Sequence, residues 1–219
     1  MMSQDICIQG SKDFLYLALE DRLKRSGINI ISDPKNASST IGIDTKDEVD
    51  LLIVPKGSKN NNGRLVITIH DLIIPTGHSK WSPKDIYLFV EQIKNNEINI
   101  IDKSKIHYLV HIRDAIEAIS MIVLSNNFHD SRGTMNICGR RAWSNESIFN
   151  ELKMLWTRFH NSINYTHTTE SLSKIPSIIR ENNRKNRERP NLDSLNKELI
   201  RAGGDGWHPL TPLRTGLME

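Results

Sequence analysis

The residues from Gly10 to Tyr16 stand where dinucleotide-binding proteins carry a glycine-rich loop that holds a pyrophosphate. Gly10 ends a short apolar run and precedes a helical pattern, as the first glycine of such a loop does. The second and third glycines let the backbone approach the phosphates and let helix and strand pack closely. Asp13 and Tyr16 hold these two positions here. A carboxylate at a helix start caps the helix and repels phosphate, so the sequence predicts that Asp13 is a cap.

The eight histidines include one pair with the spacing of metal ligands. His107 and His111 are four residues apart, and on a helix this spacing would place both imidazoles on one face. The residues from His107 to Ile112 predict a strand instead, on which the two side chains would share a face but lie far apart. The sequence contains no CxxC or HExxH pattern. We therefore expect no metal site.

The elements that position these residues follow from the spacing of the apolar side chains. Residues 5–10 predict a buried strand, residues 14–26 a helix with one leucine-rich face, and residues 28–31 a second strand. This is the order of a parallel βαβ unit, the opening of a Rossmann-type sheet. Further strands are predicted at residues 41–44, 50–55, 64–70, 98–101, 108–112, 134–138 and 164–167, a helix at residues 115–123, and further helices capped by Ser82, Ser144 and Asp193.

The segment from Lys105 to Phe149 resembles the C-terminal part of the extended short-chain dehydrogenase/reductases, the sugar-nucleotide epimerases, dehydratases and reductases. It keeps the order of their pattern "V-x-V-x-D-x-A-x-A-I … N-I-G-G … S-x-x-E-I". Residues 189–197 resemble "R-P-x-x-x-x-L-D-x-x-K", and residues 206–217 resemble "L-G-W-x-P-x-x-x-L-x-x-G-L". The resemblance implies a truncated and degenerate relative with an α/β fold, a reduced Rossmann-like parallel sheet and a small C-terminal substrate-type lobe. It implies a degenerate Rossmann-type half at residues 1–80, followed by the remaining Rossmann elements and a nucleotide-sugar-type lobe at residues 81–219.

The chain departs from the family in a section that is missing after residue 57. In the family, that section carries a Tyr-x-x-x-Lys pair, whose lysine lowers the tyrosine pKa so that the phenol exchanges a proton as hydride moves. The residues four positions after the four tyrosines are Glu20, Glu91, Ile112 and Thr169, and none is lysine. The sequence therefore predicts no catalytic residues. The missing helices commonly build the dimer interface of the family, so the usual homodimer is in doubt.

The resemblance also implies contacts for a cofactor and for a substrate. The matching positions are Gly10, Ser11, Asp33 and Asp44 for the cofactor, and Trp81 and Arg189 for the substrate. Asp33 matches the acid that holds the adenosine ribose in NAD-binding relatives, and it is equally well explained as a turn residue before Pro34. Trp81 can stack on a base or a sugar, although a core position suits it better. Arg189 is the candidate for a phosphate contact.

The composition excludes several classes of protein. Charged residues make up 25% of the chain and the net charge is +3, which is too weakly basic for nucleic-acid binding. The basic cluster at residues 180–189 is diluted by asparagine and glutamate, and we expect a solvated loop or helix there. No apolar run approaches the ~20 residues of a membrane span, and the N-terminus has no signal pattern. Cys7 and Cys138 lie in apolar runs, as core cysteines of a reduced, cytoplasmic protein do.

Two functions remain open after these observations. The first, which we favour, is a non-catalytic relative that needs no cofactor and binds a nucleotide sugar or a protein partner in a sugar-nucleotide or polysaccharide pathway. The second is an enzyme of such a pathway that binds NAD(P) and has an atypical active site. The missing tyrosine–lysine pair and Asp13 favour the first function. The C-terminal signatures that the chain retains favour the second.

Overall fold

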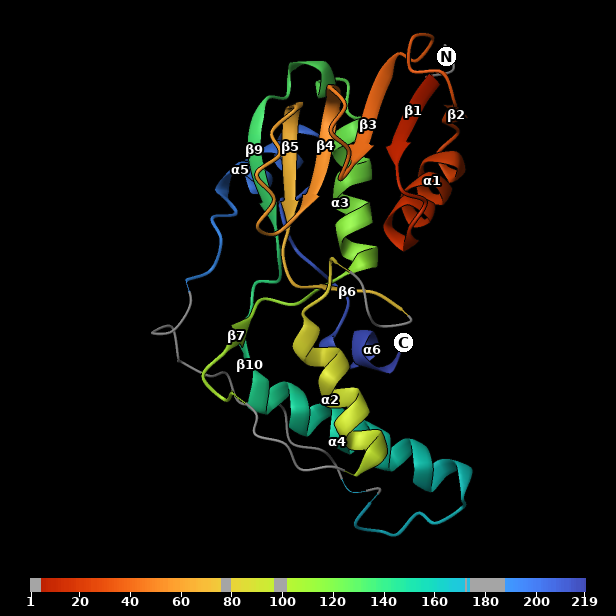
Figure 1. Ribbon diagram of the computed structural model, residues 1–219, viewed down its shortest axis with the longest axis vertical. Helices are drawn as coiled ribbons and strands as arrows, with labels where there is room; N and C mark the ends of the chain where they lie inside the picture. Colours follow the sequence, from red (N-terminus) through yellow and green to blue (C-terminus); the bar gives the residue numbers. More distant parts are fainter. Residues whose placement is uncertain (1–4, 76–79, 97–101, 172, 174–187) are drawn as a thin grey trace.

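The computed structural model describes residues 5–75, 80–96, 102–171, 173 and 188–219, and a parallel sheet forms its upper half (Figure 1). The six strands of this sheet are all parallel, which confirms the predicted α/β fold with a Rossmann-like sheet. From one edge to the other, the strands are β2 (Asn29–Ile31), β1 (Asp5–Gly10), β3 (Ser39–Ile43), β4 (Val49–Pro55), β5 (Gly63–Ile69) and β9 (Gly133–Ile137).

Three helices pack against one face of this sheet and enclose the main core. They are α1 (Phe14–Arg25), α3 (Ile112–Leu124), which is followed by the short 3-10 helix η1 (Phe128–Asp130), and α5 (Asp193–Arg201). The leucine-rich face predicted for α1 is confirmed, because its three leucines at helical spacing are buried against the sheet. The helices α3 and α5 and the strand β9 all come from residues 81–219, so the sheet is completed by the second half of the chain.

The opposite face of the sheet carries no helix within the described residues. In doubly wound sheets, helices cover both faces, because each parallel crossover normally contains one. Here β3 joins β4 through residues 44–48, and β4 joins β5 through residues 56–62, and these connections cross the open face (Figure 1). Leu52, Val54 and Val66 point to this face and are nevertheless buried. The two short connections therefore take the place of the missing helices.

Two asparagines tie these connections to each other. The side-chain amide of Asn60 donates to the backbone oxygen of Thr45, and the amide of Asn62 donates to the backbone oxygen of Lys46 at 2.8 Å. The backbone oxygen of Asn62 accepts a further bond from the N–H of Val49 at 3.1 Å. These bonds satisfy backbone groups that a helix would have paired internally.

The lower lobe consists of α2 (Lys84–Asn95), α4 (Asn145–Ile163) and α6 (Leu213–Met218) around a smaller apolar cluster (Figure 1). Two short ladders connect this lobe to the sheet. In one, β7 (Ile106–His107) pairs with β10 (Trp143–Ser144), and in the other, β6 (Leu72–Ile73) pairs with β8 (Val110–His111). No described helix combines the length and the apolar character that a bilayer crossing requires.

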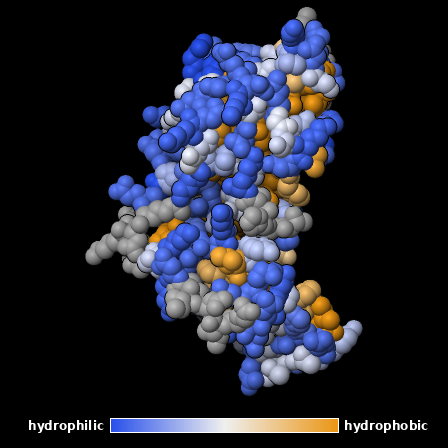
Figure 2. Space-filling view, in the orientation of Figure 1, coloured by the Kyte–Doolittle hydropathy of each residue, from blue (hydrophilic) through white to orange (hydrophobic). Residues whose placement is uncertain are grey.

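The far end of α4 extends beyond the smaller apolar cluster. Figure 2 shows an apolar patch at the lower right of the molecule, where Figure 1 places the C-terminal end of α4. The large apolar residues of this end are Phe159 and Ile163, each 56% exposed. The apolar face of α4 therefore continues past its contact with α2.

Most predicted elements are confirmed, and the cap of α4 is confirmed in detail. The hydroxyl of Ser144 accepts a hydrogen bond from the backbone N–H of Ser147 at 3.1 Å, with Glu146 in the first turn of the helix. Cys7 and Cys138 are both buried and free, as the apolar runs around them predict. Local apolar spacing and cap residues were sufficient for these predictions.

Four local predictions are wrong. The N-cap residue of α2 is Pro83 instead of Ser82, and that of α5 is Leu192 instead of Asp193, so neither helix has a side-chain cap. The strand predicted at residues 108–112 is reduced to β8, because α3 already begins at Ile112. Residues 164–167 form a turn and loop that pair with no strand, because α4 extends to Ile163. The strand predicted at residues 98–101 lies outside the described residues.

Candidate functional site

The turn after β1 has the shape expected at the first glycine of a phosphate-binding loop. Gly10 has a φ of +122°, and a Cβ atom there would lie 2.3 Å from the carbonyl oxygen of Ile43, at the end of β3. Only glycine satisfies both constraints. Ser11 follows as an exposed residue, and its backbone oxygen accepts a hydrogen bond from the N–H of Asp13 at 2.7 Å. The chain therefore turns tightly from β1 into α1.

Asp13 uses both of its carboxylate oxygens at the N-terminus of α1. Its Oδ1 accepts a hydrogen bond from the backbone N–H of Tyr16 at 3.1 Å, which confirms the predicted N-cap. Its Oδ2 accepts a hydrogen bond from the indole nitrogen of Trp81 at 2.8 Å. The N–H groups at a helix start are the ones that bind a phosphate. A phosphate at this point would meet an N–H that is already bonded and a negative charge.

Tyr16 stands in place of the third glycine and fills the space between α1 and the sheet. Its side chain is buried in the main core, and its hydroxyl donates to the backbone oxygen of Ile8 at 3.5 Å. Burial raises the pKa of this phenol above its ordinary value, and the nearby charge of Glu20 raises it further. An aromatic ring therefore separates the helix from the strand where a glycine would let them meet.

The side chains of Lys80 and Trp81 bind carboxylates that follow β3 and β1, respectively. Trp81 is 3% exposed and belongs to the main core. The ammonium of Lys80 lies 2.6 Å from Oδ2 of Asp44, one of the predicted cofactor residues, and 5.4 Å from the centre of the Trp81 ring. Asp13 and Asp44 therefore both bind side chains from this segment of the same chain.

Asp33 forms a local turn after β2. Its Oδ1 accepts a hydrogen bond from the backbone N–H of Lys35 at 3.0 Å, and its Oδ2 accepts one from the amide of Asn36 at 2.8 Å. These bonds match the turn that Asp33-Pro34 favours. Burial raises the pKa of the neighbouring Cys7 thiol, and the charge of Asp33 raises it further. A contact of Asp33 with a ribose stays a prediction.

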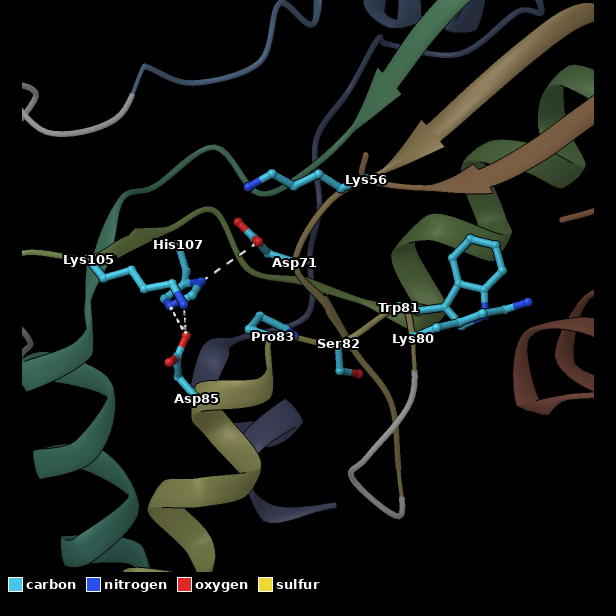
Figure 3. Close-up of a pocket in the computed structure, with 9 residues that line it drawn as sticks. All are labelled: Lys56, Asp71, Lys80, Trp81, Ser82, Pro83, Asp85, Lys105 and His107. Atoms are coloured by element: carbon cyan, nitrogen blue, oxygen red, sulfur yellow. Dashed lines mark ion pairs between the residues drawn. The ribbon is translucent and has the colours of Figure 1, made fainter. Parts of the chain in front are cut away.

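A pocket of about 200 Å³ lies between the carboxyl ends of β4 and β5 and the lower lobe (Figure 3). Ligands of parallel α/β sheets bind at the carboxyl ends of the strands, so this is the candidate ligand site. The pocket is rich in charged side chains and includes the predicted substrate residue Trp81. Its lining residues are Lys56, Asp71, Lys80, Trp81, Ser82, Pro83, Asp85, Lys105 and His107.

His107 is the most buried charged or titratable residue of this pocket, at 2% exposure. Its Nε2 lies 2.9 Å from Oδ1 of Asn145 and 3.4 Å from Oδ2 of Asp85. The other amide atom of Asn145, Nδ2, donates to the backbone oxygen of Asp102 at 3.0 Å, so the amide oxygen must face the histidine. In the neutral ring, Nε2 therefore carries the proton and Nδ1 carries the lone pair.

Asp71 lies on the other side of the same imidazole. It has a φ of +49° in the turn between β5 and β6, and its side chain is 7% exposed. Its Oδ2 accepts a hydrogen bond from the backbone N–H of Tyr108 at 2.8 Å, and its Oδ1 lies 3.7 Å from Nδ1 of His107 (Figure 3). The carboxylate is thus held by the backbone and turned toward the histidine.

The three lysines of the pocket differ in their partners. Lys105 forms an ion pair with Asp85, and Lys80 forms one with Asp44. Among the described residues, no carboxylate lies within ion-pair distance of the ammonium of Lys56. Lys56 therefore supplies the positive charge in the pocket that is most accessible to an anionic ligand.

The structure brings together residues that sequence reasoning did not assign to a common ligand site. Asp71 and His107 come from distant segments, and the sequence indicated His107 only as one of a possible pair of metal ligands. One signal was available, because Lys56 and Asp71 follow predicted strands at the edge where ligands bind. The predicted substrate residue Arg189 lies outside this pocket and donates to the backbone oxygen of Arg140 at 3.4 Å. Its contact with a phosphate stays a prediction.

No family model and no curated protein matches the sequence. Solved structures match nearly the whole chain. RMD from Pseudomonas aeruginosa, complexed with NADPH, matches 99% of this chain and 95% of its own, with a TM-score of 0.58 and 9% identity. The UDP-glucose 4-epimerase from Thermotoga maritima, with UDP-glucose, matches 98% of this chain and 96% of its own, with a TM-score of 0.55 and 12% identity. The chain has the fold of the extended short-chain dehydrogenase/reductases.

A dehydratase shares this fold too. The dTDP-glucose 4,6-dehydratase from Bacillus anthracis, in complex with NAD, matches 98% of this chain and 94% of its own, with a TM-score of 0.56 and 10% identity. These three solved structures therefore show that the fold of this chain is similar to theirs over nearly its whole length. The hydrogen bond between Trp81 and Asp13 and the ion pair between Lys80 and Asp44 are contacts observed in this chain itself.

Proposed function

We propose that this protein binds a nucleotide sugar and does not oxidise or reduce it. It is a non-catalytic relative of the sugar-nucleotide epimerases and dehydratases, with a binding role in a sugar-nucleotide or polysaccharide pathway. The observation that carries the proposal is that Asp13 and Asp44 already bind Trp81 and Lys80. A dinucleotide in the usual pose would have to break the indole hydrogen bond and the ion pair, and would place its phosphates beside the Asp13 carboxylate.

The tyrosines of the chain also support a role without hydride transfer. None is followed by lysine four positions later, and none lines the pocket. The proton exchange that accompanies hydride transfer in these enzymes needs a phenol with a lowered pKa. Tyr16 has the opposite shift, because its burial raises the pKa.

Binding measurements with two groups of compounds test the proposal. Thermal unfolding and calorimetry would compare NAD, NADP and their reduced forms with UDP-, GDP- and dTDP-sugars. A ligand at 100 times its dissociation constant stabilises a protein by about 2.7 kcal/mol, which raises the melting temperature by a few degrees. We expect such a shift with at least one nucleotide sugar and none with the dinucleotides.

An NAD(P)-dependent enzyme with an atypical active site is the second candidate. His107 favours it, because a buried imidazole between Asp71 and Asp85 has the residue types of an acid–base centre. A saturable shift with a dinucleotide would overturn the first proposal in favour of this enzyme. If neither group of compounds bound, both candidates would fail and a protein partner would be sought.

A further inference from the structure

His107, which lines the pocket, has a hydrogen-bond acceptor on its neutral ring. The amide of Asn145 assigns the ring proton to Nε2, so Nδ1 has a lone pair. This Nδ1 is buried and has no hydrogen-bond partner among the described residues. The nearby Oδ1 of Asp71, at 3.7 Å, is itself an acceptor and cannot supply the missing proton when ionised. A hydrogen-bond donor on a ligand would therefore remove the free-energy cost of leaving this buried nitrogen without a partner.

The charges of the pocket restrict the chemistry of that donor. A ligand ammonium could donate to Nδ1, but the three lysines of the lining, Lys56, Lys80 and Lys105, outnumber its two carboxylates, Asp71 and Asp85, so the pocket is net positive when His107 is neutral. A hydroxyl donates equally well and carries no positive charge. Since Lys56 has no carboxylate partner among the described residues, a ligand that also carries an anionic group would gain a charge-assisted contact.

The size of the pocket restricts the ligand further. Its volume of about 200 Å³ is below the ~300–1,000 Å³ of pockets that enclose a drug-sized ligand. A single sugar ring with its anionic group suits such a pocket better than a complete nucleotide sugar does. The nucleotide of a larger ligand would then extend beyond the lining residues.

We propose that the pocket holds the anionic sugar part of the ligand, with a sugar hydroxyl donating to Nδ1 of His107 and the anionic group beside Lys56. This inference rests on the proposed nucleotide-sugar binding and identifies the residues that recognise the sugar. The anionic group is a phosphate or a carboxylate, because Lys56 recognises the negative charge and not the atoms that carry it.

Calorimetry with small probes tests the ligand class. The probes are glucose 1-phosphate and galactose 1-phosphate for a phosphate, glucuronate for a carboxylate, and glucose and inorganic phosphate for the separate parts. We expect at least one anionic sugar to bind, and to bind at least about tenfold more tightly than glucose or inorganic phosphate does. Equal binding of inorganic phosphate and the sugar phosphates would overturn the inference, because the hydroxyl contact would then contribute nothing.

Two lysine variants test the anionic contact. Lys56→Met removes the unpaired charge of the pocket, whereas Lys59→Met removes the same charge from the same connection at an exposed position outside the lining. We expect Lys56→Met to weaken binding of the sugar phosphate about tenfold and Lys59→Met to leave it unchanged. Equal effects of the two substitutions would contradict the assigned role of Lys56.

The nitrogen resonances of His107 test the hydroxyl contact without any substitution. Long-range ¹H–¹⁵N spectra distinguish a protonated ring nitrogen from one with a lone pair. We expect the Nδ1 resonance to move on addition of the sugar phosphate and to stay in place with inorganic phosphate. An Nδ1 resonance that does not respond to the sugar phosphate would overturn the inference.

The two proposals can fail separately in these experiments. Binding of UDP-glucose with no response of Lys56→Met and no change at His107 would overturn the sugar site and leave nucleotide-sugar binding standing. If UDP-, GDP- and dTDP-sugars and all three anionic sugars failed to bind, both proposals would fall together.

Discussion

Asp13 determines what the N-terminus of α1 can bind. The same carboxylate caps the helix and accepts the indole hydrogen bond of Trp81, so it joins the first helix to the residues that precede α2. A glycine at this position would leave the backbone N–H groups available to a phosphate. One side chain thus converts a phosphate site into an internal contact.

Replacing Asp13 should separate its capping role from its charge. Asp13→Ala removes both hydrogen bonds and should lower the free energy of unfolding by about 1–2 kcal/mol. Asp13→Asn keeps an oxygen that can cap α1, so its free energy of unfolding should fall by less. Urea unfolding of the three proteins measures the difference. Equal stability of the alanine variant and the parent protein would show that neither bond contributes.

Tyr16 should make the protein sensitive to alkaline pH. Its pKa is raised by burial, so above the ordinary value of about 10 the unfolded chain loses its phenolic proton before the folded chain does. The stabilising contribution is therefore fully present below about pH 10 and is lost as pH rises through the folded pKa. In Tyr16→Phe, the free energy of unfolding measured with urea should fall less steeply as the pH rises through the alkaline range. Tyr165→Phe, at a 95% exposed position, is the control and should unfold like the parent protein.

The cap at Asp13 could be predicted from the sequence, whereas the centre around His107 could not. A cap depends on residues within one helical turn, so local sequence contains the whole signal. Asp71, Asp85 and His107 lie on three separate segments and meet only because the lower lobe packs against the sheet. Their relation depends on tertiary contacts that residue spacing does not encode.

At the level of elements, the connections between β3, β4 and β5 replace a layer of helices. Apolar runs predicted these three strands closely, because each strand is buried on both faces. The sequence also indicated that the section after residue 57 is short. How the second face is covered could not be predicted, because it depends on side-chain bonds such as those of Asn60.

Breaking the bond between the two connections should destabilise the sheet. Asn60→Ala removes the amide that donates to Thr45 and the side-chain oxygen that accepts from the N–H of Asn62 at 3.1 Å. We expect a loss of about 1–2 kcal/mol in the free energy of unfolding. Asn61→Ala, at an exposed neighbouring position, should change stability by less than about 0.5 kcal/mol. Similar losses in both variants would mean that the amide bond of Asn60 adds no stability.

At the level of the whole molecule, one large core and one small core meet at the pocket. The sheet and its three helices share the main cluster, while α2, α4 and α6 surround the smaller one. The sequence predicted both parts, a Rossmann-like sheet and a small C-terminal lobe, through its resemblance to the extended short-chain dehydrogenase/reductases. The division at residue 80 stays a prediction. Strands from both sides of this point belong to the sheet.

Hydrogen exchange should differ between the two parts. Local opening costs the most free energy where apolar burial is greatest, so amides of β3, β4 and β5 should exchange last. The C-terminal turns of α4, with Phe159 and Ile163 both 56% exposed, should exchange first among the helical amides. Mass spectrometry of peptic fragments after timed exchange in D₂O measures this order. Equal protection in the two regions would contradict it.

The short connections also bear on the order in which the protein folds. Ile41 pairs with Leu51 and Leu51 with Leu65, so neighbouring strands at the centre of the sheet are close in sequence. Ile67, in contrast, pairs with Met135, far along the chain. Closing a short loop costs less chain entropy than closing a long one, and topologies rich in local contacts fold faster. β3, β4 and β5 are therefore suited to assemble first, on a nascent chain that has not yet supplied β9.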